Sequence, residues 1–255
     1  MKCFKLFSHG DHRWLAFSQD DHKPGSVVDT TQVVITAGKS AMLLDPGGIE
    51  IFPSMMGALV HEVDMATVNH IFLSHQDPDV GSGLALWRQV TPPATQIHLS
   101  AIWTSYVSHY DADAKFAPIP DEGSDLNLGG TTLRFLPAHY MHSPGCFCVY
   151  DPVAKGLFSG DIGAAILPDT LGGEVWVTNF DSHVQHMAGF HRRILASREA
   201  RDAWVEMVGR LKLDFMVPQH GLAFRGADIP RFLDWLSNLA IGSGIDAYRG
   251  RAARG

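Results

Sequence analysis

The stretch 72-FLSHQDPDVGSG-83 places one histidine and two aspartates at alternate positions, between an apolar run and a glycine-rich turn. Side chains at alternate positions after the end of a strand can converge on one cavity if the chain turns there. One proline and two glycines in the same stretch permit such a turn. The stretch therefore predicts a polar site at a strand end, formed by His75, Asp77 and Asp79.

Three further polar residues follow apolar runs in the same way, where an α/β sheet usually presents its ligand-binding loops. They are His142 in 137-PAHYMHSPG-145, Asp161 in 157-LFSGDIG-163 and His220 in 217-VPQHG-221. With the first stretch they supply three imidazoles and three carboxylates. Two divalent metal ions that share one bridging carboxylate need about this set of donors.

The composition is that of an ordinary globular protein. The chain has 255 residues, 45% hydrophobic and 18% charged, and is long enough for a sizeable core. Its net charge of −7 argues against a nucleic-acid partner or an anionic membrane surface. The chain shows neither a membrane-spanning apolar run nor a signal-peptide pattern, so we expect a cytoplasmic location. Cys146 and Cys148 are expected to be small buried packing residues, not parts of a disulfide framework.

Short apolar runs bounded by Gly, Asp, Asn or Pro predict strands at 31–38, 41–48, 70–75, 95–100, 131–139, 146–151, 155–161 and 213–221. Helices are expected at 82–90, 197–213 and 228–240, the last with Asp228 as its N-cap. Strands dominate each half of the chain and helices close each half. This order predicts an α/β fold with two packed sheets and helices outside, a four-layer αββα sandwich. We expect a single domain over 1–255, built of two halves that meet near 121–130.

The polar clusters occur in the order His-x-Asp-x-Asp, His-Ser-Pro-Gly, Ser-Gly-Asp and Pro-Gln-His-Gly, after 43-LLDPGG-48. This order resembles the metallo-β-lactamase superfamily over residues 28 to 222. The resemblance implies an αββα sandwich with a dinuclear metal site at the edge of the two sheets.

The hydrolases of that superfamily carry a His-x-His-x-Asp-His pattern, whereas this chain has Asp77 and Val80 at two of those positions. In this respect the chain resembles the flavodiiron-like branch, in which an acid replaces the second histidine. It is most similar to the stand-alone oxygen-binding diiron proteins, which lack a flavodoxin domain. No flavin cofactor is therefore expected in this chain.

The resemblance implies a role for each donor. His75, Asp77 and His142 would hold the first iron ion, Asp79 and His220 the second, and Asp161 would bridge them. Val80 stands where the flavodiiron pattern has another histidine, which implies an open or water-filled coordination position on the second metal. Two neighbouring residues are expected to support the site by orienting a ligand or donating to bound oxygen, namely His139 and Tyr140.

Replacing an imidazole by the carboxylate of Asp77 makes a site harder and more anionic, which suits iron better than zinc. The resemblance then implies a diiron protein that binds dioxygen. It would act as an oxygen sensor with a signalling partner, or as an oxidoreductase-like protein that reduces oxygen with electrons from a separate donor. The alternative is a zinc-dependent hydrolase of a lactone, thioester or phosphodiester. Family members often form dimers, so a homodimer is expected.

The segment 179–197 contains three histidines and has two interpretations. Its Phe180, Met187 and Phe190 could shield the metal ions while its histidines tune access, or the segment could be a partly exposed helix start. Seven other histidines show no usable pattern and are expected on the surface, namely His9, His12, His22, His61, His70, His98 and His109.

Overall fold

The computed structural model of the protein describes residues 1–168 and 173–248. Its first sheet contains seven strands in chain order. They are β1 (Lys2–His9), β2 (His12–Ser18), β3 (Gln32–Ala37), β4 (Ser40–Leu44), β5 (Val68–Phe72), β6 (Gln96–Ser100) and β7 (Phe116–Ile119). Pairing is antiparallel from β1 to β4 and parallel from β4 to β7.

The second sheet has six strands in the order β13-β12-β11-β10-β9-β8. They are β8 (Ser124–Leu128), β9 (Thr131–Pro137), β10 (Phe147–Asp151), β11 (Gly156–Gly160), β12 (Phe215–Pro218) and β13 (Phe224–Arg225). Only the pair β11 and β12 is parallel among the described strands of this sheet. The parallel pair directs the ends of both strands toward the same edge.

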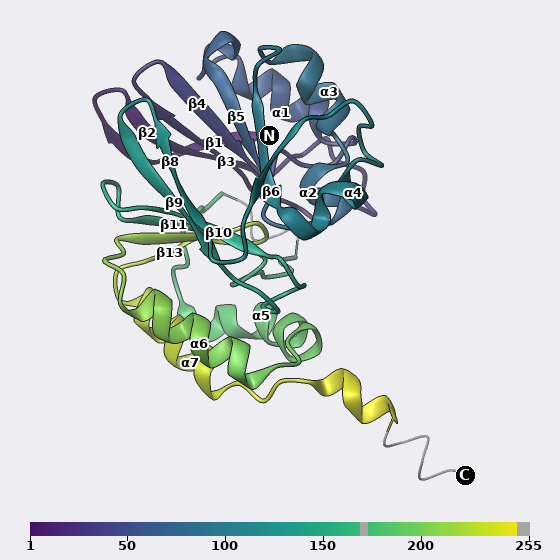
Figure 1. Cartoon of the computed structure of the whole chain (residues 1–255). Helices are drawn as coiled ribbons and strands as arrows, with labels where there is room; N and C mark the ends of the chain where they lie inside the picture. The colour runs from purple at the N-terminus through teal and green to yellow at the C-terminus, as the bar shows by residue number, and fades with distance from the viewer. Residues whose placement is uncertain (169–172, 249–255) are drawn as a thin grey trace.

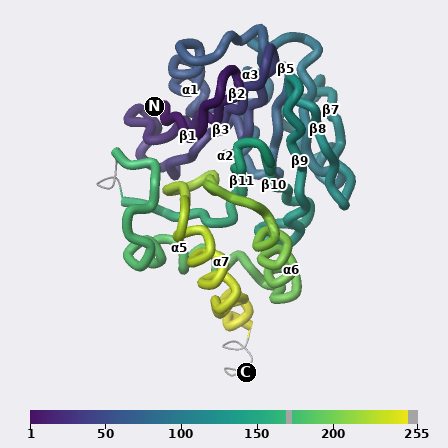
Figure 2. Tube along the Cα trace, turned by 90° about the vertical axis from the view of Figure 1, so that its left-hand side faces the viewer, coloured from purple at the N-terminus to yellow at the C-terminus, as the bar shows by residue number. Residues whose placement is uncertain are grey.

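Helices lie outside the two sheets (Figures 1 and 2). The first half carries α1 (Phe52–Leu59), α2 (Pro78–Gly81), α3 (Leu84–Val90) and α4 (Thr104–Val107), and the second carries α5 (Phe180–Ile194), α6 (Arg198–Gly209) and α7 (Asp228–Asn238). Short 3-10 turns occur at Met65–Thr67, Ala101–Trp103 and Ser243–Ile245. No helix of the described ranges has the length and apolar character to cross a bilayer.

Three apolar clusters correspond to the three interfaces between four layers. Within β3, Val33 and Ile35 face the second sheet, whereas Val34 faces the helices of the first half. This alternation is the period of a strand that is buried on both faces. The third cluster joins the second sheet to α5, α6 and α7. The αββα sandwich is confirmed.

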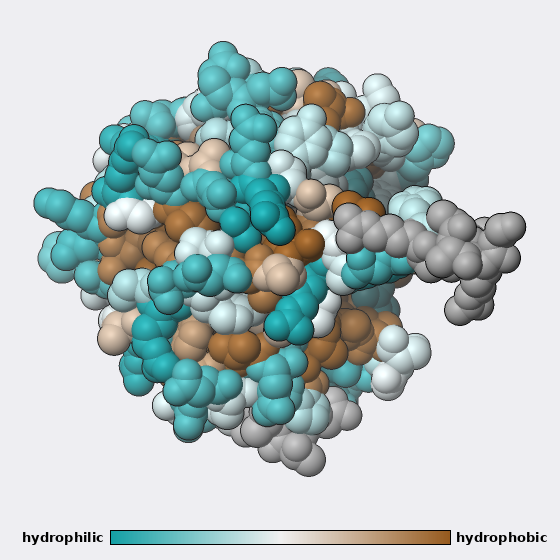
Figure 3. All heavy atoms as spheres, turned by 90° about the horizontal axis from the view of Figure 1, so that it is seen from below, coloured by the Kyte–Doolittle hydropathy of each residue, from teal (hydrophilic) through white to brown (hydrophobic). Residues whose placement is uncertain are grey.

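The helices of the second half also present apolar side chains to solvent. Figure 3 views the molecule from below, the side of α5 to α7 in Figure 1, and shows apolar patches separated by hydrophilic side chains. Residues such as Leu233 and Trp235 on α7 are only partly buried against the helical core.

All eight strands and all three helices expected from sequence are present, with ends shifted by a few residues. The structure adds elements that the sequence did not predict, notably the N-terminal hairpin of β1 and β2. The expected N-cap of α7 is wrong, because Asp228 is its first helical residue and Ala227 is the N-cap. The Asp228 carboxylate instead lies 3.5 Å from the Arg231 guanidinium.

The expected boundary near 121–130 coincides with the change of sheet, since β7 ends the first sheet and β8 begins the second. The interpretation of 1–255 as one domain of two related halves remains a prediction. Cys146 and Cys148 are buried, unpaired and part of the helical core, as expected.

The expected surface location is wrong for two histidines. His12 and His98 are 8% and 6% exposed. His98 lies against Phe135 between the sheets, and its Nε2 is 3.0 Å from Nδ1 of His70. Burial lowers the pKa of His98 to about 4, so its ring is neutral at physiological pH.

A buried polar contact ties the two sheets together. Asp151, at the end of β10, is fully buried. Its Oδ2 accepts hydrogen bonds from Trp14 Nε1 at 2.8 Å and from His12 Nε2 at 2.6 Å, both on β2. Its Oδ1 accepts from the backbone N–H groups of Val153 and Ala154. Removing this acceptor would leave four buried or partly buried donors unsatisfied.

We therefore expect Asp151→Ala to lower the free energy of unfolding by about 3–5 kcal/mol, the range for breaking a buried charged contact. Urea denaturation of the metal-free protein measures the change. The matched control is Asp125→Ala on β8, whose side chain is exposed, with an expected change within about 0.5 kcal/mol. Equal effects of the two substitutions would contradict the assignment of Asp151 as the link between the sheets.

Candidate metal centre

The six expected ligand residues come together at one edge of the sandwich. His75, Asp77 and Asp79 follow β5 of the first sheet; His142 lies between β9 and β10, Asp161 directly follows β11, and His220 comes two residues after β12. Each of these side chains leaves a strand end of one of the two packed sheets. The site is therefore shared by both halves of the fold.

Three of these residues form a compact donor group. One potential ligand atom each from His75, Asp77 and His142 lies within 4.8 Å of the others. Asp77 Oδ2 is 3.1 Å from His142 Nε2 and 3.7 Å from His75 Nε2. A cation between these atoms would meet two imidazole nitrogens and one carboxylate oxygen.

Asp161 lies between this group and the remaining donors. Its Oδ2 is 3.9 Å from His75 Nε2 and 3.4 Å from His142 Nδ1. Its Oδ1 is 3.5 Å from His220 Nε2, and that nitrogen is 3.2 Å from Asp79 Oδ2. Asp161 thus presents one oxygen to each of two donor groups, as a bridging carboxylate would.

The turn that carries Asp161 depends on a glycine. Gly160 has a φ of +57°, and a Cβ at this position would lie 2.9 Å from Ser74 Oγ. A larger residue would be strained and would press on the segment that carries His75. The Ser-Gly-Asp sequence therefore allows the end of β11 to approach the end of β5.

Two buried atoms test whether this donor set fits a metal ion. Asp161 Oδ1 and His142 Nδ1 have no hydrogen-bond partner within the described parts of the chain. Buried polar atoms without partners are uncommon because they lose their hydration without compensation. A metal ion beside His220 would supply the missing partner of Asp161 Oδ1. The His142 ring has Nε2 toward Asp77 and Nδ1 toward Asp161, and one of these two nitrogens can coordinate an ion in the first donor group. The residues present therefore fit a dinuclear site.

His75 is held by a chain of polar contacts. Its Nδ1 is 2.8 Å from Ser74 Oγ, which donates to Asp45 Oδ2 at 2.5 Å. The Ser74 N–H donates to the other oxygen of Asp45 at 2.7 Å. This support turns Nε2 of the ring toward Asp77 and Asp161. Burial raises the pKa of Asp45 to about 8. The sequence signal for this support was 43-LLDPGG-48.

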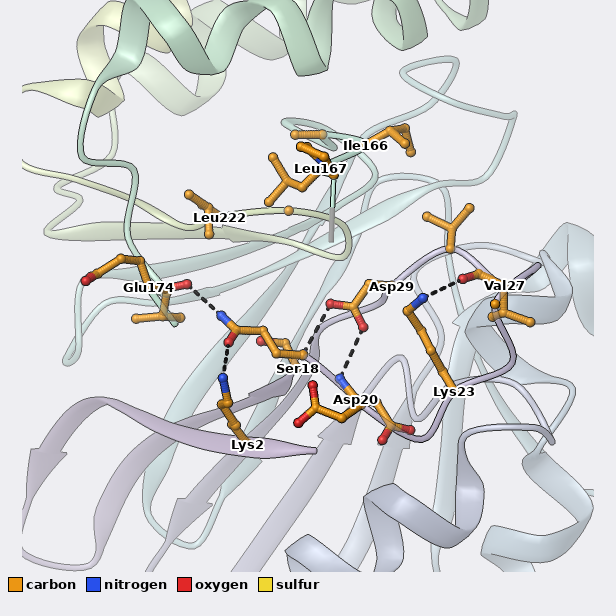
Figure 4. Close-up of a pocket in the computed structure, with 18 of the residues that line it drawn as sticks. Lys2, Ser18, Asp20, Lys23, Val27, Asp29, Ile166, Leu167, Glu174 and Leu222 are labelled. Atoms are coloured by element: carbon orange, nitrogen blue, oxygen red, sulfur yellow. Dashed lines mark hydrogen bonds between the residues drawn. The ribbon is translucent and has the colours of Figure 1, made fainter. Parts of the chain in front are cut away.

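His220 has an analogous support. Its Nδ1–H donates to the backbone carbonyl of Asp29 at 2.9 Å, which leaves Nε2 to face Asp79 and Asp161. Asp29 also lines a cavity of about 510 Å³, together with Gly221 (Figure 4). Its carboxylate accepts from the backbone N–H of Asp20 at 3.4 Å. The residue whose backbone carbonyl orients the His220 ring therefore also forms part of the cavity wall.

Two histidines of the site pair with aspartates, His142 with Asp77 and His220 with Asp79, whereas the pKa of His75 is dominated by its burial. Burial lowers the pKa of His75. Burial also acts to lower the pKa of His142 and His220, but the neighbouring carboxylates outweigh it and raise both, that of His220 to about 9. Burial would raise the pKa of Asp77 and Asp79, but their hydrogen bonds to the histidines hold both below the usual range.

Helix α5 covers part of the site. The Phe190 ring stacks on His142 with centroids 5.9 Å apart. His191 is buried; its Nε2 accepts from the Gly163 N–H at 3.0 Å and its Nδ1–H donates to the Met187 carbonyl at 2.9 Å. Arg192 and Arg193 are exposed. The segment is therefore an amphipathic helix with one face packed over the site and its basic residues outside.

The two expected supporting residues lie beside the His142 loop. His139 donates from Nε2 to the Asp121 carbonyl at 2.7 Å and accepts at Nδ1 from the Gly145 N–H at 3.2 Å. Tyr140 is 60% exposed and has a φ of +65°. These contacts fix the loop conformation, and a direct role toward a ligand or oxygen stays a prediction. Val80 is fully buried in the core against the first sheet.

A family model and two solved structures that match this chain carry the same family description. The family model described as "ODP family beta lactamase" matches residues 28–221. The structure described as the peroxy diiron species of the chemotaxis sensor ODP has a TM-score of 0.84 and 35% identity, and covers 95% of this chain and 97% of its own. The apo state of the sensor from T. denticola gives a TM-score of 0.82 with the same identity and covers 95% of this chain and 96% of its own.

More distant matches belong to longer proteins. A flavo di-iron protein mutant from Thermotoga maritima has a TM-score of 0.79 at 18% identity and covers 94% of this chain and 61% of its own, so it supports the fold alone. A Synechocystis sp. protein that carries the name diflavin flavoprotein A 3 is 32% identical over 148 residues. That match covers 56% of this chain and only 24% of the relative.

The position of Asp161 between two donor groups predicts the metal stoichiometry of a variant. Asp161→Asn keeps the side-chain shape but replaces one anionic oxygen by an amide. We expect bound iron(II) to fall from about two ions per chain to about one or fewer. Anaerobic iron(II) titration followed by desalting and metal analysis measures the change. The control Asp125→Asn, at an exposed position, should bind as the parent does; unchanged stoichiometry in Asp161→Asn would contradict a bridge.

The raised pKa of His220 predicts proton release on metal binding. Below about pH 9 the ring of the metal-free protein is protonated, and it must lose that proton to coordinate a metal. Apparent affinity should therefore rise with pH and level off above about pH 9, where release from this ring ends. Calorimetry with zinc(II) in buffers of different ionisation enthalpy counts the protons. Release that is independent of pH, or equal in His220→Gln, would contradict this assignment.

Proposed function

Because the chain belongs to the ODP family of β-lactamase-like proteins, we propose that it is a diiron protein that binds dioxygen as a sensor. The observation that carries the proposal is the position of Asp161, with one carboxylate oxygen toward each of two donor groups. The match to the peroxy diiron species of a chemotaxis sensor, over nearly the whole of both chains, supports the same conclusion.

The proposed ligands divide unequally between the two ions. His75, Asp77 and His142 would hold the first, and Asp79 and His220 the second, with Asp161 shared. The second ion therefore has one terminal protein ligand fewer. Val80, at the position where a further ligand would stand, is directed into the core. We expect weaker binding of the second ion and a coordination position there that is open to a small molecule.

Two irons, when bound, supply the electrons and the affinity for dioxygen, and the residues of the chain hold and shield them. Asp45 with Ser74 fixes the ring of His75, and the Asp29 carbonyl fixes that of His220. The Phe190 ring covers one face of His142 and limits the access of water there. The site offers imidazoles and carboxylates in equal number. This donor set favours iron over zinc, because zinc prefers sites that are richer in nitrogen and sulfur ligands.

The sensor is favoured over an oxygen reductase by the comparisons. The chain matches the sensor over 97% of the sensor's length at 35% identity, whereas the match to the flavo di-iron protein at 18% identity supports the fold alone. A sensor needs a signalling partner, whereas a reductase needs an electron donor. A signalling partner therefore belongs to the proposal, and a homodimer in the cytoplasm remains the expectation from sequence.

An anaerobic optical titration tests the function. The protein is loaded with iron(II), its spectrum is recorded, oxygen is admitted and then removed. We expect a near-ultraviolet and visible band that appears with oxygen at about two irons per chain and is lost when oxygen is removed. A band that persists until a reductant is added would indicate a reductase. Absence of a band, with tight zinc binding and ester hydrolysis, would favour the hydrolase.

Asp77 should control the choice of metal. Asp77→His gives the first metal ion three imidazole ligands in place of two imidazoles and a carboxylate. We therefore expect zinc affinity to rise relative to iron affinity by about tenfold or more, and oxygen binding to weaken. Competition between the two metals, followed by metal analysis, gives the ratio. Asp113→His is the control, because Asp113 has a 90% exposed side chain. An unchanged metal ratio and oxygen spectrum in Asp77→His would contradict the role given to this carboxylate.

A further inference from the structure

The side chain of Gln76 occupies the position next to the proposed ligand Asp77. We infer that Gln76 is a positioning residue that makes Asp77 a one-oxygen ligand and so keeps a coordination position free for dioxygen. This inference rests on the proposed function for its oxygen arm. The part that concerns how Asp77 binds a metal ion does not depend on oxygen binding.

The two oxygens of Asp77 have different neighbours. Gln76 Nε2 donates to Oδ1 at 2.8 Å. The other oxygen, Oδ2, lies 3.1 Å from His142 Nε2 and 3.7 Å from His75 Nε2, on the side of the donor group. One oxygen is therefore committed to the amide and the other faces the place where a metal ion would bind.

The orientation of the Gln76 amide is fixed from the other end. Ser143 Oγ donates to Gln76 Oε1 at 2.8 Å, so the carbonyl end of the amide points to Ser143 and the amino end to Asp77. The Tyr110 hydroxyl donates to the backbone carbonyl of Gln76 at 2.9 Å. The side-chain carbonyl and the backbone carbonyl of Gln76 are thus each held by a group outside its own loop.

The anchor continues into the core. Ser143 Oγ lies 3.3 Å from Cys146 Sγ, and that sulfur also accepts from the Ser143 N–H at 3.3 Å. Cys146 is buried in the helical core. Ser143 also directly follows His142, so the same contact ties the loop after β5 to the loop that supplies another proposed ligand. Gln76 therefore couples the position of Asp77 to that of His142.

A carboxylate can bind a metal through one oxygen or through both. Chelation through both oxygens would fill an additional coordination position on the first ion. It would also weaken the hydrogen bond from Gln76, because a metal ion bound to Oδ1 would withdraw negative charge from the oxygen that accepts it. A neutral amide performs this task without adding charge to a site that already holds three carboxylates. Gln76 thus favours the open form of the site.

The test uses Gln76→Ala with Gln89→Ala as its control, since Gln89 is an exposed glutamine on α3. Cobalt(II) replaces iron in the full chain, because the visible ligand-field bands of cobalt(II) weaken as the coordination number rises. We expect a lower absorbance per bound cobalt in Gln76→Ala, with metal affinity retained or increased. Gln89→Ala should behave as the parent.

The iron-loaded proteins give the second readout. In Gln76→Ala we expect oxygen affinity to fall by about ten- to one-hundredfold while iron(II) affinity is kept. Ser143→Ala should lower the cobalt absorbance and the oxygen affinity, as Gln76→Ala does. Ser143→Thr, which retains the hydroxyl, should leave both at the values of the parent protein. A role for Gln76 in folding alone would instead lower iron and oxygen affinity together, and that result would overturn the inference.

The cobalt spectra separate this inference from the proposed function. If the parent protein shows no oxygen-dependent band, the proposed function fails, but the comparison of cobalt absorbance still measures the binding mode of Asp77. Unchanged cobalt absorbance in Gln76→Ala would overturn the inference, even if the parent protein binds oxygen as proposed.

Discussion

The arrangement of the site depends on one carboxylate. Asp161 is buried where β11 ends, and its two oxygens face separate donor groups, one built around His75 and His142 and one around His220. Without counter-charges, three carboxylates and three imidazoles this close together would be costly to bury. In the proposed site, a pair of cations that shares Asp161 would satisfy these groups together, and this would explain why donors from both sheets converge on this edge.

The fold provides the rigidity that such a site needs. The two sheets are joined by a continuous apolar layer, in which Phe72 stacks on Phe135 with ring centroids 5.3 Å apart. The buried contact of Asp151 with His12 and Trp14 adds a polar link between the same sheets. Since His75 leaves one sheet and His220 the other, a shift between sheets would separate the ligands. We therefore expect stability and metal binding to be coupled through this interface.

The convergence of these six side chains could be expected from sequence because each comes shortly after an apolar strand, a local pattern. Their supports could not, because they come from distant parts of the chain: His220 and its partner Asp29 are 191 residues apart. The burial of His12 likewise depends on Asp151, 139 residues away. Strand β1 was missed because it is an edge strand whose side chains are mostly exposed, so it lacks the apolar run of a buried strand. Strand β2 is buried and does carry such a run, so this strand could have been predicted from sequence.

Anomalous scattering at the iron edge from crystals of the anaerobically iron-loaded protein tests the bridging role of Asp161 most directly. We predict two iron peaks about 3.5–4 Å apart, the separation of bridged two-metal sites, on either side of the Asp161 carboxylate. One peak should lie beside His75 and His142, and the other beside His220. A single peak in the first group, with Asp161 bound through one oxygen and no metal near His220, would contradict the account.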